Sequence, residues 1–312
     1  MKKLDFKKLL TIIILGLFSI AINAQNRHEI SIYGAGGFSI LDYKLDLGKK
    51  DLLGIGGHFG IGYKYFFNRN LGLVTAVEMS PYNSNCIVNK LSIKYQTTDK
   101  DGEVFEFHSD ITDYRENQKV VMLQIPIMLQ FQVGKKHQFY VAAGGKIGFP
   151  IALSNYNGSI VRIYNEGYYE FENYTYTSQH EFLGFGYYSL LENKGNLNLK
   201  TAFFVSVDFG AKWKLSEKIF LYTGLYFDYG LNNIYKKTDK PKNFVEYNSN
   251  NPSDIIVNGI MNSQYTENGT DYKNFMSKLS PLAAGIKICL TFGIGKLEKK
   301  EEARLKDFTN RN

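Results

Sequence analysis

Cysteine, proline and tryptophan are scarce in this chain of 312 residues, which contains two, six and one of them. Two cysteines allow at most one disulfide. Cys86 lies in a polar segment and Cys289 in an alternating apolar one, so we expect two buried thiols. Long hydrophobic runs are also absent: beyond the N-terminus, no stretch approaches the roughly 20 apolar residues of a membrane-spanning helix.

Charge of one sign is not concentrated in any segment. The formal net charge is +7, and the first 24 residues hold four lysines and one aspartate, which leaves about +4 for the rest. No basic stripe accompanies this small excess, so we expect no nucleic-acid partner.

The N-terminus has the three parts of a secretory signal peptide. Basic MKKLDFKK precedes apolar LLTIIILGLFSIAI, and NAQ offers Ala24 as a cleavage point. We therefore predict a signal peptide at residues 1–24, a mature domain at 25–295 and a charged periplasmic tail at 296–312. A membrane anchor is the alternative, but the apolar run is short for one. The tail can be an amphipathic helix or a solvated end.

What the sequence has in abundance is aromatic residues, 23 Tyr and 23 Phe, set in alternating patterns. In PLAAGIKICLTFGIG (281–295), every second residue from Leu282 to Ile294 is apolar, and those between are small or polar. A period of two predicts a β-strand. The same alternation recurs at about 29–40, 54–67, 71–80, 119–133, 137–149, 199–215 and 218–231.

The connections between these eight segments alternate in length. NRN, GKKHQ and SEK are short, whereas 41–53, 81–118, 150–198 and 232–279 are long. Tight periplasmic turns and large extracellular loops are typical of outer-membrane barrels. The less apolar face carries Gly, Ser, Lys, Asp, Gln and Tyr, which does not fit the apolar interior of a soluble barrel. We predict an all-β, eight-stranded antiparallel up-and-down transmembrane β-barrel whose apolar face contacts outer-membrane lipid. Its periplasmic aromatic girdle would comprise Tyr65, Phe67, Phe131, Phe139, Trp213 and Phe292.

Two of these strands resemble a known family. VVMLQIPIMLQFQ is similar to the Leu-x-Ile-Pro-Leu-Leu-Leu-Lys-Tyr strand of PorT-like outer-membrane β-barrel proteins of Bacteroidota, and FYVAAGGKIGFPI resembles the strand that follows it there. The resemblance covers the mature chain to about residue 295. It implies a barrel fold and leaves open an accessory role in secretion or envelope assembly. The long Tyr- and Asn-rich loops and the charged tail depart from the family pattern.

Inward-facing polar residues form the first candidate site. An eight-stranded barrel has an interior just wide enough for its own side chains, and buried charges require partners. We predict a lumen polar network that fixes the strand register, with a proton-linked or gating role as the alternative. Its members are His58, Lys64, Glu78, Lys146, Asp208, Lys212, Asp228 and Lys287.

The long connections supply the second candidate. Tyrosine offers a large contact area at a low cost in conformational entropy, so the loop at 150–198 suggests a recognition surface for a glycan or a protein. Its tyrosines are Tyr164, Tyr168, Tyr169, Tyr174 and Tyr176. The alternative is that they only pair across an extended hairpin. LSIKYQTTDKDGEVFEF predicts a hairpin around Asp101-Gly102, and EYNSNNPSD, at 246–254, predicts a mobile loop.

Other motifs predict no chemistry. One group of glycines lacks the spacing and βαβ context of a dinucleotide fingerprint, and we expect it to permit bends and close strand packing. Its members are Gly34, Gly36, Gly37, Gly54, Gly56 and Gly57. His108 lies near Asp110 and Asp113 but has no accompanying nucleophile, which indicates a solvated hairpin residue. His58 and His180 have no ligand at metal-binding spacing, so we expect neither a metal nor a cofactor.

We therefore expect a non-enzymatic outer-membrane protein whose barrel anchors long loops for a structural or recognition role. An enzyme acting on lipid or peptide at the extracellular rim and a small passive channel are the alternatives. The sequence does not indicate the oligomeric state.

Overall fold

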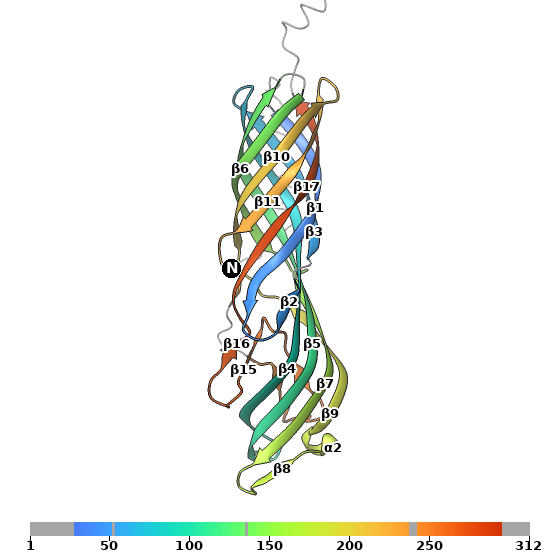
Figure 1. Cartoon of the computed structure of the whole chain (residues 1–312), viewed down its shortest axis with the longest axis vertical. Coiled ribbons are helices and arrows are strands. Elements are labelled where there is room, and N and C mark those ends of the chain that lie inside the picture. Colours follow the sequence, from blue (N-terminus) through green and yellow to red (C-terminus); the bar gives the residue numbers. More distant parts are fainter. Residues whose placement is uncertain (1–27, 52–53, 135–136, 237–241, 295–312) are drawn as a thin grey trace, which may run out of the picture.

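A computed structural model of the chain describes residues 28–51, 54–134, 137–236 and 242–294. The predicted signal peptide, residues 1–24, and the predicted tail, residues 296–312, both fall outside these ranges. The described part is elongated, with a ring of tilted strands at one end and a curved sheet at the other (Figure 1). Within it, no helix is long and apolar enough to cross a membrane.

Eight strands form the ring. In ring order they are β1 (His28–Leu45), β3 (Ile55–Phe66), β4 (Leu71–Thr98), β5 (Val104–Gly134), β6 (His137–Pro150), β10 (Ala202–Lys214), β11 (Ile219–Gly230) and β17 (Met276–Ile294). Each strand pairs antiparallel with its neighbour in this order, and β17 pairs back with β1. The predicted strand number and antiparallel order are confirmed.

Side chains along the ring alternate between the two faces, as the period of two predicts. On β3, Ile55, Phe59 and Ile61 are 78%, 60% and 58% exposed, whereas His58 and Lys64 are buried. The apolar set therefore points away from the ring, which is the face that lipid covers in an outer-membrane barrel. The predicted girdle aromatics lie near the short connections; Phe292, for example, pairs with Ile219 at the start of β11.

Two of the glycines permit close strand packing. A methyl group at Gly57 would collide with the carbonyl oxygen of Ala35, and one at Gly37 would collide with that of Ala284. Gly37 and Gly57 lie on adjacent strands of the ring. Larger residues there would force the neighbouring backbones apart.

The strands β4 and β5 are much longer than predicted, at 28 and 31 residues. They continue beyond the ring as a hairpin that turns at Asp101-Gly102, as predicted, with Gly102 at a φ of 86°. β7 (Asn155–Tyr169) pairs with β5, and β9 (Gly186–Asn196) pairs with β7. The smaller elements here are β2 (Lys49–Asp51), β8 (Tyr174–Tyr176) and α2 (His180–Leu183).

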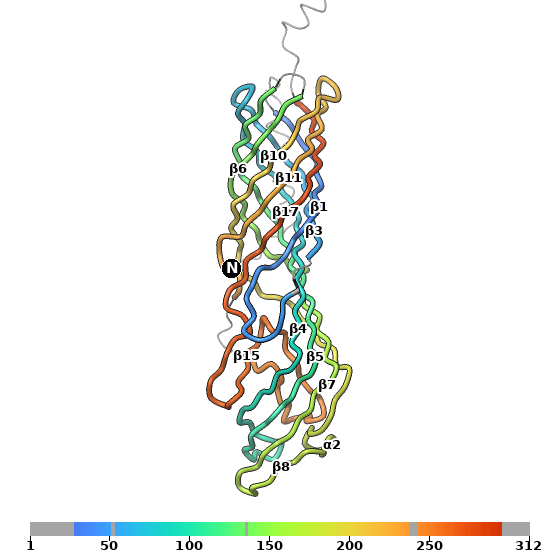
Figure 2. The backbone as a smooth tube through the Cα atoms, in the orientation of Figure 1, coloured from blue at the N-terminus to red at the C-terminus, as the bar shows by residue number. Residues whose placement is uncertain are grey.

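The segment between β11 and β17 covers one face of this sheet (Figure 2). It contains β12 (Lys242–Asn243), β13 (Val245–Glu246), β14 (Ile256–Val257), β15 (Ser263–Tyr265) and β16 (Lys273–Asn274). We call the sheet beyond the ring, together with residues 242–275, the extension. Its buried core includes Tyr95, Phe105, Phe107, Tyr114, Ile163, Phe185, Phe244, Ile260, Met261 and Phe275.

The segment 246–254, predicted to be a mobile loop, contacts the core of the extension through Tyr247. The ring of Tyr247, within that segment, lies 4.9 Å from the ring of Phe105, and the Tyr95 hydroxyl accepts a hydrogen bond of 2.9 Å from the Tyr247 amide. The same hydroxyl donates to the carbonyl of Val245 at 3.1 Å. Apolar residues are isolated in this part of the sequence, so their burial depends on a sheet contributed by distant strands.

Candidate functional site: the lumen network and the tyrosine face

A lysine bridges two carboxylates at the centre of the lumen. Lys146 Nζ, from β6, is 2.7 Å from Glu78 Oε1 on β4 and 2.9 Å from Asp228 Oδ2 on β11. The three side chains are inward-facing and buried. Buried charges are stable only when they are paired and hydrogen-bonded. These two ion pairs link strands β4, β6 and β11.

A second ion pair lies beside this triad. Lys287 Nζ is 2.7 Å from Asp208 Oδ2, and it also lies over the ring of Tyr33, 4.3 Å from the centroid. The Tyr33 hydroxyl donates to Glu78 Oε2 at 2.7 Å. Tyr33 therefore links the two groups of charges.

The third group lies nearer the short connections. Lys212 Nζ is 2.7 Å from Glu29 Oε1, and the Tyr222 hydroxyl donates to Glu29 Oε2 at 3.0 Å. Lys64 Nζ lies over the Tyr222 ring, 3.3 Å from the centroid, which is a cation–π contact. Glu29 was not among the predicted network residues. The alternation with inward-facing Ser31 and Tyr33 is the signal that locates it.

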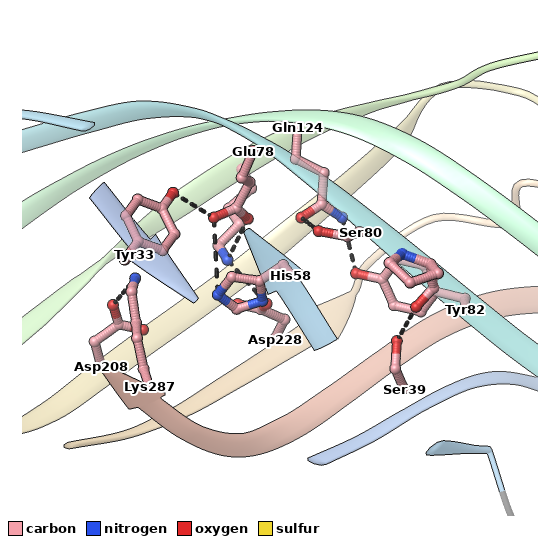
Figure 3. Close-up of polar contacts among 12 residues, drawn as sticks. Tyr33, Ser39, His58, Glu78, Ser80, Tyr82, Gln124, Asp208, Asp228 and Lys287 are labelled. Atoms are coloured by element: carbon pink, nitrogen blue, oxygen red, sulfur yellow. Dashed lines mark hydrogen bonds and ion pairs between the residues drawn. The ribbon is translucent and has the colours of Figure 1, made fainter. Parts of the chain in front are cut away.

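His58 is the remaining predicted member of the network. Its Nε2 lies 3.9 Å from Glu78 Oε2, and its ring meets the ring of Tyr226 edge-on at 4.5 Å. Figure 3 shows His58 between Glu78 and Asp228, and one ligand atom from each of the three lies within 4.8 Å of the others. All three residues belong to the predicted lumen network, but their spacing along the sequence does not show that they converge, because Glu78 and Asp228 lie on other strands than His58.

These side chains fill the ring at the height of the network. The described residues around Tyr33, Lys64 and Tyr222 leave a cavity of about 30 Å³, which holds only a water or two. Cys289 lines this cavity, whereas Cys86 is buried in the extension core, and the two thiols are not joined.

The second candidate site, formed by the tyrosines of residues 150–198, is split between the two faces of the extension sheet. Tyr164 and Tyr168 lie on the outer face of β7, whereas Tyr169 is 2% exposed and donates to Asp99 Oδ2 at 3.0 Å on the inner face. Tyr174 pairs with Tyr169, and Tyr176 packs against the extension core. The prediction of one surface from all five tyrosines is wrong, because neighbouring residues of a strand point to opposite faces.

The outer face of the extension carries a different set. Tyr187 on β9 pairs with Tyr164, with ring centroids 4.6 Å apart, and is 64% exposed. The Arg162 guanidinium lies 5.9 Å from the Tyr187 ring centroid. We call this surface the tyrosine face; across β4, β5, β7 and β9 it consists of Lys94, Glu106, His108, Asp110, Arg162, Tyr164, Glu166, Tyr168 and Tyr187. Tyr187 was missed because its own segment, GFGYYSLL, has no clear alternation.

His108 lies in the middle of the tyrosine face and contacts two acids. Its Nε2 is 2.9 Å from Glu106 Oε1 and its Nδ1 is 3.2 Å from Glu166 Oε1. Lys94 Nζ is 2.7 Å from the same Glu106 oxygen. Partial burial acts to raise the pKa of Glu106, but the hydrogen bonds from Lys94 and His108 outweigh it and lower this pKa below its ordinary value. His108 thus contacts Glu106 on its own strand through Nε2 and Glu166 on the neighbouring strand β7 through Nδ1.

A carboxylate that has no basic partner among the described residues lies inside the extension. Glu116 is 1% exposed and accepts hydrogen bonds from the Tyr114 hydroxyl, from Gln118 Nε2 at 2.6 Å and from the Ile260 amide at 2.9 Å. Burial raises the pKa of Glu116, and these three donors oppose the rise. The sequence did not indicate Glu116, because its partner Ile260 is 144 positions away.

Comparison with known proteins agrees with this architecture. Residues 23–236 match a family model described as an outer membrane protein beta-barrel domain. No curated protein sequence matches the chain.

Similar solved structures are also barrels of outer-membrane proteins. OprG from Pseudomonas aeruginosa is 11% identical with a TM-score of 0.34, and the match covers 88% of this chain and 99% of that one. Neisserial surface protein A is 10% identical with a TM-score of 0.30, covering 85% and 96%. The Ail protein of Yersinia pestis is 10% identical with a TM-score of 0.29, covering 86% and 99%. At these scores the structures carry no argument about ligand or activity.

Proposed function

This chain belongs to the outer membrane protein beta-barrel domain family, and we propose that its barrel is a non-enzymatic anchor for a folded extracellular extension that binds a protein partner. The barrel places the chain in the outer membrane. The extension lies at the end with the long connections, which is the extracellular end in barrels of this type.

The packing of the extension carries this proposal. One face of its sheet is covered by residues 242–275, whereas the tyrosine face has no covering segment among the described residues. A core that includes Tyr95, Phe105 and Phe244 would hold the tyrosine face in a fixed shape. A preorganised surface loses less conformational entropy on binding than a flexible loop does.

The chemistry of the tyrosine face favours a protein over a small ligand. Ligands of drug size bind in concave sites, whereas this surface is the face of a sheet. Tyrosine and arginine are enriched among the residues that dominate protein interfaces, and Tyr187 and Arg162 are both exposed. A filled lumen also favours an anchor over a passive channel.

The ion pairs on the tyrosine face also fit the role of a non-enzymatic anchor. Both ring nitrogens of His108 contact carboxylates, and the Lys94–Glu106 and His108–Glu166 pairs join neighbouring strands, which suits structural stabilisation more than proton transfer. The resemblance of two strands to PorT-like proteins is compatible with a partner in secretion or envelope assembly.

Site-specific photo-crosslinking on intact cells tests the proposal. A photoreactive phenylalanine at Tyr187 should give one defined protein adduct, and the Arg162→Ala and Tyr164→Ala substitutions should reduce its yield several-fold. The matched control is the same probe at Tyr229, which is 46% exposed on the outside of the ring. If no protein adduct forms and a glycan-array signal is lost in Tyr187→Ala, the partner of the tyrosine face is a carbohydrate and not a protein. Equal adducts from both positions would refute recognition by the tyrosine face.

A further inference from the structure

Three side chains with atoms that can bind a metal converge in the lumen. They are those of His58, Glu78 and Asp228, and one such atom from each lies within 4.8 Å of the others (Figure 3). His58 Nε2 is 3.9 Å from Glu78 Oε2, which is too long for a hydrogen bond. We propose that these three side chains bind a divalent first-row transition-metal ion, such as Zn²⁺. The inference concerns the barrel interior and does not depend on the proposed recognition function.

The two carboxylates each keep an oxygen that the central lysine does not use. Lys146 contacts Glu78 Oε1 and Asp228 Oδ2. Asp228 is fully buried, and its Oδ1 has no hydrogen-bond partner among the described residues. His58 is 5% exposed, and its Nε2 also lacks a partner within the described ranges. A buried acceptor without a partner is unfavourable, and a cation among these atoms would satisfy both.

The donor set identifies the class of ion. One imidazole nitrogen with two carboxylate oxygens suits Zn²⁺, Mn²⁺ or Fe²⁺, whereas Ca²⁺ and Mg²⁺ prefer oxygen ligands alone. Metal-bound carboxylates are usually held by further hydrogen bonds. Glu78 has such support from the Tyr33 hydroxyl and Lys146, and Asp228 has it from Lys146.

The first test is metal stoichiometry in the full-length mature barrel, purified from outer membranes in detergent. The protein is stripped with a chelator, exposed to Zn²⁺, freed of excess ion and analysed by elemental mass spectrometry. We expect about one zinc per chain in the wild type and a loss of at least fivefold in His58→Ala and Asp228→Asn. The matched control is Asp208→Asn, which removes a buried ion pair of the same lumen but no proposed ligand, and it should retain the zinc.

Heat-dependent migration on a denaturing gel establishes that each variant is folded. If a ligand variant does not fold, X-ray absorption spectroscopy of the zinc-loaded wild-type protein tests the proposal instead. A shell of nitrogen and oxygen donors at about 2.0–2.2 Å with imidazole scattering supports the site. Zinc below one-tenth per chain overturns the proposal. So does zinc that survives both His58→Ala and Asp228→Asn, because it would then be bound at other positions.

Discussion

Lys146 and Asp228 are 82 positions apart in the sequence, yet Lys146 Nζ and Asp228 Oδ2 lie 2.9 Å apart across the lumen. The same ammonium is 2.7 Å from Glu78 Oε1. One lysine on β6 thus forms ion pairs with carboxylates from both β4 and β11. The ring is held together by the backbone hydrogen bonds between its strands and also by this internal ion-pair bridge.

Removal of the bridge should destabilise the barrel strongly. In Lys146→Met, two buried carboxylates lose their cation, and we expect the free energy of unfolding to fall by about 3–5 kcal/mol. Urea unfolding of the protein refolded in lipid vesicles measures this change. Lys50→Met is the control, because the Lys50–Asp42 pair has a carboxylate with a 65% exposed side chain and should contribute less than about 1 kcal/mol. A loss below about 1 kcal/mol for Lys146→Met would contradict the bridging role.

The extension should be loosened locally by removal of one hydroxyl. Tyr95→Phe leaves the Tyr247 amide and the Val245 carbonyl without their partner. An unsatisfied buried group costs about 1–3 kcal/mol, so proteolysis within residues 246–254 should accelerate by about tenfold while the barrel stays heat-modifiable. Tyr174→Phe, at a residue that is 55% exposed, serves as the control. Equal cleavage rates for Tyr95→Phe and wild type would show that these hydrogen bonds do not hold the segment.

The stability of the extension should depend on the protonation of Glu116. Burial raises the pKa of this carboxyl above its ordinary value of 4.5. The folded extension then binds the proton more tightly than the unfolded chain does, so its stability is greatest below pH 4.5 and declines as the pH rises through the raised pKa.

Hydrogen exchange of the Ile260 amide, corrected for its intrinsic pH dependence, follows this decline. Glu116→Gln has no titrating group here and should show a flatter protection profile. Glu192→Gln, at an exposed position, should leave the profile unchanged. Protection that increases with pH in the wild type would mean that the sign is reversed.

Passive flux through the barrel should be minimal. With a lumen cavity of about 30 Å³ lined by side chains that include Tyr33 and Tyr222, planar bilayers containing the wild type should show no stepwise conductance. The double variant Tyr33→Ala and Tyr222→Ala opens this region and should introduce measurable steps if it folds. Discrete openings in the wild type would show that the lumen rearranges to form a pore.

Much of the ring follows from local patterns in the sequence. The alternation from Leu282 to Ile294 places side chains on two faces regardless of context, so the strand, its apolar outer face and inward Lys287 could all be predicted. The extension could not be predicted in the same way. Within residues 81–118 the sequence predicts the hairpin at Asp101-Gly102 but not the full length of its strands, because the segment is largely polar. Its inner apolar positions, such as Ile93 and Phe107, are buried by a distant segment of the chain.

The sequence by itself determined the number of ring strands, their faces and the identity of most inward charges, because a period of two and the spacing of short turns are local properties. Tertiary structure alone decided which charges meet. Glu78, Lys146 and Asp228 are brought together by the register of strands that are distant along the chain. It also decided that Tyr169 is buried while Tyr164 is on the outer face, since covering one side of a sheet requires the remote segment 242–275. Contacts of this kind depend on long-range pairing, which no local pattern encodes.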